Sequence, residues 1–269
     1  MHGTIQITQS DGLKIHTFTA PERGWQVNSH VIELSSELLI VDSQYLLPYA
    51  QEVVAYAGRL QKPITRLYIS HYHPDHLLGA AAFSAPIYAL REVIEKVEAV
   101  GDRVAREEHE KFGDDVPETA VRPSHVVQPG SEEIESISLE HIHLQNAETE
   151  DALMIGFPAQ EILITQDLVY NRVHAMVGEK AFETWKDALE TKKTASYNRI
   201  LPGHGAPGGK ELYDLMQRYL STAQDLYAQS ADGEDLKSRM IQAFPDYGGV
   251  GMLDQQKRFL FPSGKVRVD

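Results

Sequence analysis

The chain has 269 residues, 25 basic and 39 acidic side chains, a formal net charge of −14 and no cysteine. The lack of cysteine excludes disulfides and thiolate metal ligands. The acidic balance argues against nucleic acid as a partner, because phosphate binding needs concentrated Lys and Arg. The sequence contains no run of eighteen apolar residues, so it predicts no membrane span. Without a signal-peptide pattern we expect a soluble cytoplasmic protein, although a trimmed secreted form would look the same.

The chain opens with short segments of alternating apolar and polar residues, which is typical of strands. We expect strands at 4–9, 13–19, 27–34 and 38–41. Gly-, Pro- and Asp-containing turn signals separate the first of them. A helix is expected from Pro48 to Leu60, because proline suits the start of a helix.

Four potential metal ligands then fall within six positions, in the run SHYHPDH at residues 70–76. A short apolar run with β-propensity precedes them and a helix-like stretch follows. Because residues two apart on an extended chain point the same way, His71 and His73 can converge on one ion. Asp75 and His76, at the start of the helix, can serve a second ion. Clustered imidazoles with a carboxylate are the ligands expected for zinc or iron.

The rest of the chain alternates strands and helices. We expect strands at 86–89, 124–128, 134–144, 153–157 and 161–165, and helices at 91–112, 181–195 and 209–229. Gly101 is a candidate interruption of the first of these helices. The pattern predicts two packed sheets with helices outside them. We expect a main domain at 1–231 and an extension at 232–269 that docks on this domain or on a partner subunit, as in a homodimer.

Two further candidate ligands lie downstream. Asp167 follows the apolar run Ile162-Leu163-Ile164, and a carboxylate at the end of a buried strand must be paired or bound to metal. His204 lies between glycines in Pro202-Gly203-His204-Gly205, where a backbone free to bend can aim the imidazole inward.

The spacing H-x-H-x-D-H after a strand resembles the signature of the metallo-β-lactamase superfamily. Three further runs resemble landmarks of that family, in the right order: LLIVDS at 38–43, LITQD at 163–167 and ILPGHG at 200–205. The resemblance implies an α/β fold, the four-layer αβ/βα sandwich of two mixed sheets flanked by helices, with metals at one edge. It implies a first site with His71 and His73 and a second with Asp75, His76 and His204. Asp167 would bridge the two, and Asp42 would orient a ligand.

The chain departs from the family where a turn between two strands usually carries a third His. Here that turn reads QNAETED at 145–151, which puts Glu148 in the place of the His. Three interpretations compete: Glu148 is a ligand, His141 or His143 reaches the metal instead, or a single metal lies in the second site. A carboxylate in the first site shifts the metal preference from zinc towards Fe or Mn. The expected cofactor is still Zn²⁺, one or two per chain.

Such a site predicts a metal-dependent hydrolase that uses a metal-bound hydroxide to cleave a small ester, lactone, thioester or amide. Asp75 or Asp167 would take or steer the proton. Tyr170, three residues after Asp167, is similar in spacing to the acyl-homoserine-lactonase branch, where a Tyr there contacts the substrate carbonyl. Trp25 is a candidate apolar lid, and Asn28 and His30 are candidate neighbours of the site. The alternatives are a non-haem iron oxidoreductase or dioxygenase and a non-catalytic metal-binding relative.

Overall fold

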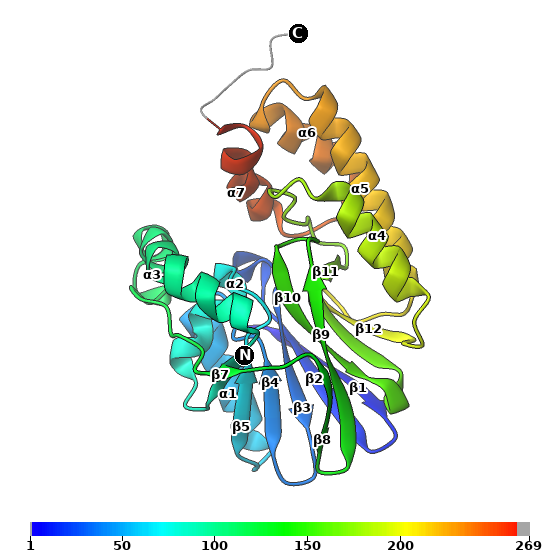
Figure 1. Cartoon of the computed structure of the whole chain (residues 1–269). Helices are drawn as coiled ribbons and strands as arrows, with labels where there is room; N and C mark the ends of the chain where they lie inside the picture. The colour runs from blue at the N-terminus through cyan, green and yellow to red at the C-terminus, as the bar shows by residue number, and fades with distance from the viewer. Residues whose placement is uncertain (1, 263–269) are drawn as a thin grey trace.

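The computed structural model describes residues 2–262. Its strands form two mixed sheets packed face to face, and helices cover the outer faces (Figure 1). Buried apolar side chains from both sheets fill the space between them and form one continuous core. The four-layer αβ/βα sandwich expected from the sequence is therefore confirmed.

The first sheet has seven strands in the order β1-β2-β3-β4-β5-β6-β7. Their bounds are Thr4–Ser10, Leu13–Thr19, Asn28–Glu33, Leu38–Val41, Ile64–Tyr68, Ile87–Ala89 and His125–Val126. The strands from β1 to β4 pair antiparallel, whereas those from β4 to β7 pair parallel. Helices α1 (Leu47–Arg59), α2 (Pro74–Leu77) and α3 (Arg91–Phe112) lie in the connections between the parallel strands. The predicted helix at 91–112 is confirmed, and Gly101 is buried within it without interrupting it.

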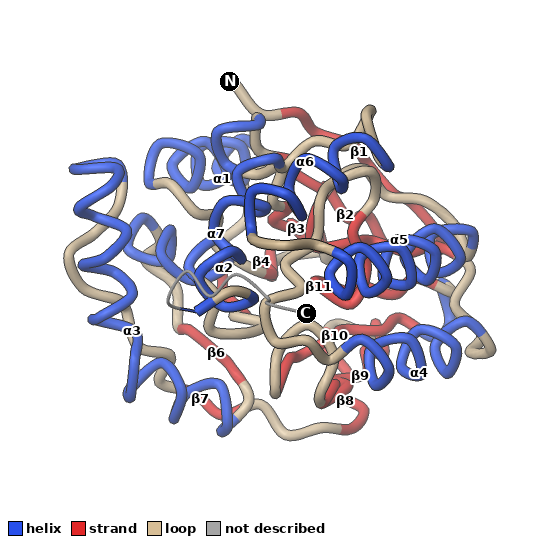
Figure 2. Tube along the Cα trace, turned by 90° about the horizontal axis from the view of Figure 1, so that it is seen from above, coloured by secondary structure: helices blue, strands red, loops and turns tan. Residues whose placement is uncertain are grey.

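The second sheet has five strands in the order β12-β11-β10-β9-β8. From β8 to β12 the bounds are Gly130–Ile134, Ile137–Gln145, Asp151–Phe157, Ile162–Tyr170 and Arg199–His204. Helices α4 (Phe182–Lys193) and α5 (Glu211–Gln229) pack together on its outer face (Figure 2). The apolar side of α5 supplies Leu212, Met216 and Leu220 to the core.

Two of the predicted strands in this sheet were drawn wrongly. The strand expected at 134–144 corresponds to β9 but starts too early, because Glu135 and Ser136 take positive φ, 48° and 68°, and reverse the chain between β8 and β9. The strand β8 before this turn was not predicted. The strand expected at 161–165 continues to Tyr170. Its pairing with β12 shifts register around Gln166, whose φ is 45°, so Asp167 lies within a distorted strand rather than after it.

The segment after residue 231 contains two more helices, α6 (Gly233–Ala243) and α7 (Val250–Leu260). The Asp232 side chain caps α6 by accepting from two backbone N–H groups. Gly249, with φ 70°, makes the turn into α7. In both ribbon views α7 lies over the end of the sandwich near α2 (Figures 1 and 2). Residues 263–269 of the predicted extension lie outside the described residues, and its start at 232 stays a prediction.

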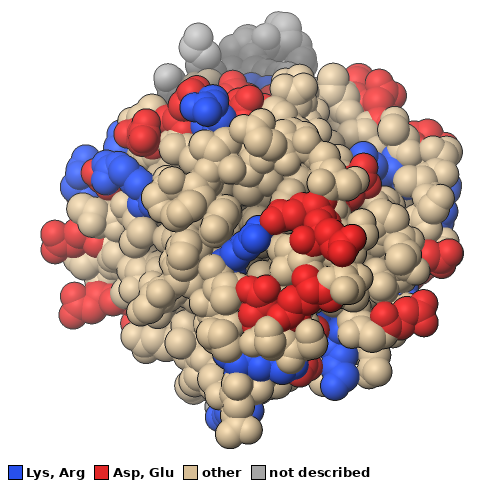
Figure 3. Space-filling view, turned by 60° about the horizontal axis from the view of Figure 1, so that its bottom comes forward, with Lys and Arg blue, Asp and Glu red and all other residues tan. Residues whose placement is uncertain are grey.

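On the face drawn in Figure 3, Lys and Arg are separated by Asp and Glu and form no broad basic patch. Within residues 2–262, no helix has the length and apolar character required to cross a bilayer.

Candidate metal centre

The carboxyl ends of two neighbouring parallel strands position the first half of the site. β4 and β5 pair in parallel, so Asp42 after β4 and residues 70–76 after β5 emerge at the same edge of the sheet. The backbone N–H of Ser70 donates to Asp42 Oδ1 over 2.7 Å, which ties the two strand ends together. His73 is the N-cap of α2, and Pro74 takes its first position.

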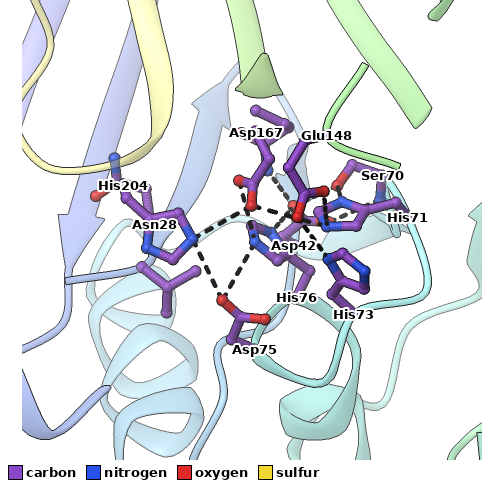
Figure 4. Close-up of polar contacts among 12 residues, drawn as sticks. Asn28, Asp42, Ser70, His71, His73, Asp75, His76, Glu148, Asp167 and His204 are labelled. Atoms are coloured by element: carbon purple, nitrogen blue, oxygen red, sulfur yellow. Dashed lines mark hydrogen bonds and ion pairs between the residues drawn. The ribbon is translucent and has the colours of Figure 1, made fainter. Parts of the chain in front are cut away.

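A first group of donors consists of His71, His73 and Glu148, whose ligand atoms all lie within 4.8 Å of one another (Figure 4). His73 Nδ1 is 3.1 Å from Glu148 Oε1, and His71 Nε2 is 3.7 Å from Glu148 Oε2. Glu148 lies at the tip of the loop between β9 and β10. A backbone hydrogen bond from Ala147 to Thr149 tightens this loop, and the Glu148 side chain is only 2 % exposed.

A second group consists of Asp75, His76 and His204. Asp75 Oδ2 is 3.2 Å from His204 Nε2 and 3.6 Å from His76 Nε2. His204 ends β12, so this group joins the loop after the first sheet to a strand of the second sheet.

Asp167 lies between the two groups (Figure 4). Its oxygens are 3.2 Å from His76 Nε2, 3.4 Å from His204 Nε2 and 3.8 Å from His71 Nε2. β12 passes so close that a Cβ at Gly203 would overlap Asp167 Oδ1, and only glycine fits there. The structure thus brings all seven predicted ligands together.

These residues fit a metal. The buried atoms that face the centre have no hydrogen-bond partner among the described residues: His71 Nε2, His76 Nε2, His204 Nε2, Asp167 Oδ1 and both Glu148 oxygens. Unpaired buried polar atoms carry a desolvation cost of about 1–3 kcal/mol each, so their convergence needs a partner. Nitrogen and oxygen donors of this kind are ligands of zinc, iron and manganese.

Hydrogen bonds to Nδ1 orient the His71 and His76 rings. His76 Nδ1 is 2.6 Å from Asp42 Oδ2, and His71 Nδ1 is 2.9 Å from Ser70 Oγ. The Ser70 hydroxyl donates its one proton to Asp42 over 2.7 Å, so it must accept from His71 Nδ1. Both rings therefore carry a proton on Nδ1, which leaves Nε2, facing the centre, as the nitrogen that can bind a metal. The expected role of Asp42 as an orienting residue agrees with this geometry.

His204 is held in the same way by the backbone. Its Nδ1 donates to the carbonyl of Trp25 over 2.9 Å. Asn28 donates to the carbonyls of Pro202 and Gly205 over 2.8 and 2.7 Å, which fixes the loop that carries His204.

The ionisation of the carboxylates reflects their crowding. Burial raises the pKa of Glu148 to about 7. Burial also opposes ionisation of Asp75, but His76 and His204 outweigh it and hold the pKa of Asp75 at about 2. In turn, Asp167 and Asp75 overcome the burial of His204 and raise its pKa to about 9. The ionised carboxylates thus favour the protonated form of the neighbouring imidazoles, and metal ions would take the place of these protons.

The two histidines considered as alternatives to Glu148 lie elsewhere. His143 Nε2 binds Asp151 over 2.7 Å, and the His141 ring lies 5.5 Å from that of Tyr68. Neither belongs to a group of donors found among residues 2–262.

A cavity of about 380 Å³ adjoins the two donor groups, and His73, Asp75, Asp167 and Tyr170 line it. The Tyr170 hydroxyl donates to Asp167 Oδ2, and its ring stacks on His204 at 4.6 Å between centroids. Trp25 also lines the cavity. It is 8 % exposed and packs on Tyr45 at 4.6 Å, so it forms a buried wall rather than an overhanging lid.

Sequence reasoning missed one polar residue behind the site. Gln166 is fully buried, and its amide nitrogen donates to Asp42 Oδ2. Its amide oxygen is 3.2 Å from Nε2 of His30. His30, expected as a neighbour of the site, therefore lies behind Gln166 and is linked to Asp42 through it. No local pattern marks Gln166, because its role depends on a positive φ at a shifted strand register.

Fold and donors together define a metal-binding αβ/βα sandwich. The sequence model of the metallo-beta-lactamase superfamily matches residues 23–204, so the chain belongs to that superfamily. Two solved structures are similar in fold. The metallo-beta-lactamase from Pontibacter korlensis has 19% identity and a TM-score of 0.60, over 81% of this chain and 99% of that one. The metallo-beta-lactamase FIM-1 from Pseudomonas aeruginosa, in its mono-zinc form, has 20% identity and a TM-score of 0.58, over 82% of this chain and 96% of that one.

Proposed function

We propose that this protein is a metal-dependent hydrolase of a small ester, lactone, thioester or amide. The observation that carries the proposal is the placement of Asp167 between two groups of buried donors beside a cavity large enough for a small substrate. His71, His73 and Glu148 would hold one metal ion, and Asp75, His76 and His204 the other. Bound there, metal ions supply Lewis acidity for a carbonyl and lower the pKa of a water.

The chain's own residues would do the rest. Burial raises the pKa of Tyr170 well above its ordinary value, so its hydroxyl keeps its proton. That proton is donated to Asp167 here, and it would turn to a substrate carbonyl once a metal ion binds the Asp167 oxygen. Asp75 is ionised at neutral pH and lies at the cavity floor, where it can accept a proton. Buried Trp25 and half-buried Tyr72 line the cavity and supply apolar surface beside the donors.

A second candidate function is oxidative. Glu148 gives the first group two histidines and one carboxylate, the ligand set of non-haem iron oxygenases. This set also makes Fe or Mn a candidate beside Zn²⁺ in that position.

Metal analysis of protein purified without added metal separates the two functions, together with assays of lactones, aryl esters and thioesters under air and under nitrogen. We expect zinc or manganese and turnover that does not depend on oxygen. Iron with oxygen-dependent turnover would contradict the hydrolase. In Asp75→Asn, retained metal with lost turnover would support proton transfer by Asp75.

A further inference from the structure

Helix α7 closes the cavity from above. Met252, Gln255, Arg258 and Phe259 of α7 line it, together with Val104 of α3. α7 begins at residue 250, whereas the superfamily model ends at residue 204. The roof of the cavity is therefore built by a part of the chain that the family match does not include.

The roof is attached to elements close to the metal donors. The backbone N–H groups of Gly249 and Val250 donate to the Glu22 carboxylate over 2.8 and 3.1 Å, at the positive end of the helix. Val177 N–H donates to Gln256 over 3.0 Å, which joins α7 to the loop after β11. These bonds fix the distance between α7 and the cavity floor.

The inner wall is mostly apolar. Trp25 and Met252 are buried, and half-buried Tyr72, Val104 and Met176 also line the cavity. One buried carboxylate, Glu108, lies among them, and Tyr45 and Lys111 donate to it. A group placed there exchanges water for apolar contacts, and the hydrophobic gain is about fourfold in affinity per buried methylene.

Both arginines that line the cavity pair with Glu107. Arg103 is 2.7 Å from Glu107, and Arg258 of α7 approaches the same carboxylate at 3.5 Å. Phe259, 47 % exposed, adds an apolar surface at the mouth, with the Arg258 guanidinium 4.7 Å from its ring centroid. The mouth therefore holds no buried free cation that would demand an anionic substrate group.

We propose that α7 selects the substrate: the apolar acyl or aryl part of a carbonyl substrate occupies the space under α7, and Met252 and Gln255 set the length that fits. This inference rests on the proposed function, since it takes the carbonyl to lie at the metal donors. The substrate class is thus a carbonyl compound with an uncharged, medium-sized apolar arm.

The test uses the full chain as purified and straight-chain carboxylates from acetate to dodecanoate, titrated by calorimetry. For the wild type we expect affinity to rise two- to fourfold per methylene until the space is full, then to stay flat. In Met252→Ala the affinity should keep rising for one or two more carbons than in the wild type. In Gln255→Phe it should stop rising at a shorter chain. Met240→Ala removes a similarly buried methionine of α6 that does not line the cavity, and it should leave the profile unchanged.

The titrations can contradict the inference in two ways. The inference is overturned if affinity does not depend on chain length. It is also overturned if both α7 variants give the same dependence of affinity on chain length as the wild type. If Met252→Ala does not fold, Gln255→Phe carries the test, because Gln255 is half-buried and tolerates a larger side chain. Ester and lactone assays on the same proteins separate the two proposals. If the α7 variants change the chain-length dependence of binding but no protein hydrolyses an ester or lactone, the proposed hydrolase activity is wrong and the apolar binding site under α7 still stands.

Discussion

Replacing Glu148 by Gln tests the unusual half of the centre without metal present. In the metal-free protein burial raises the pKa of Glu148 from 4.5 to about 7. Because the folded pKa lies above the unfolded one, stability is full below about pH 4.5 and falls as the pH rises through 7. At about 1.4 kcal/mol per pKa unit, the ionised Glu148 costs about 3 kcal/mol at pH 8 and under about 1 kcal/mol at pH 5.

Glu148→Gln keeps the shape of the side chain and removes this cost. We therefore expect the chelator-stripped variant to exceed the stripped wild type in free energy of unfolding by about 2 kcal/mol more at pH 8 than at pH 5. Urea denaturation at the two pH values measures the difference. Glu150→Gln is the matched control, because Glu150 lies two residues away with a side chain 68 % exposed, and it should show little change.

A stability difference that does not depend on pH would refute the reasoning about burial. The role of Glu148 as a ligand has its own readout in the metal-loaded protein. There Glu148→Gln should lower the metal content or weaken metal affinity, and it should lose the stability advantage. Unchanged metal content and affinity would remove Glu148 from the ligand set.

Further predictions follow from other contacts of the centre. Asp42→Asn should weaken metal affinity about 10- to 100-fold, measured by chelator competition, because it weakens the 2.6 Å contact with His76; an unchanged affinity would contradict this. Gly203→Ala should displace Asp167 and lower both metal content and melting temperature, and a variant equal to the wild type in both would be evidence against the close approach. Burial lowers the pKa of His174 to about 4, so stability should fall as the pH drops from about 6.5 to 4, and this part should be missing in His174→Phe thermal melts.

The parts of the fold that follow from local pattern were predictable. The helix at 91–112 was predicted with its observed bounds, because Val93, Ile94, Val97 and Val100 recur at helical spacing, and Val93 and Val97 are indeed buried. The spacing of His71, His73, Asp75 and His76 similarly placed the first half of the centre, since strand and helix geometry determine where those side chains point.

The parts that depend on contacts between distant segments were not predictable. No Gly, Pro, Asn or Asp at 135–136 indicates that Glu135 and Ser136 take positive φ and form the turn between β8 and β9. Gln166 gains its role only through Asp42, 124 residues away in sequence. The contribution of α7 to the cavity depends on its hydrogen bonds with Glu22 and Val177, which no periodicity reveals.

The donors of each group are divided between the two halves of the sandwich. His71, His73, Asp75 and His76 follow strands of the first sheet, whereas Glu148, Asp167 and His204 belong to the second. A ligand that binds only the folded protein stabilises it by mass action, and these donors come together only when the two sheets are packed. Removal of metal should therefore shorten the lifetime of the whole protein towards proteases, in addition to stopping the proposed hydrolysis.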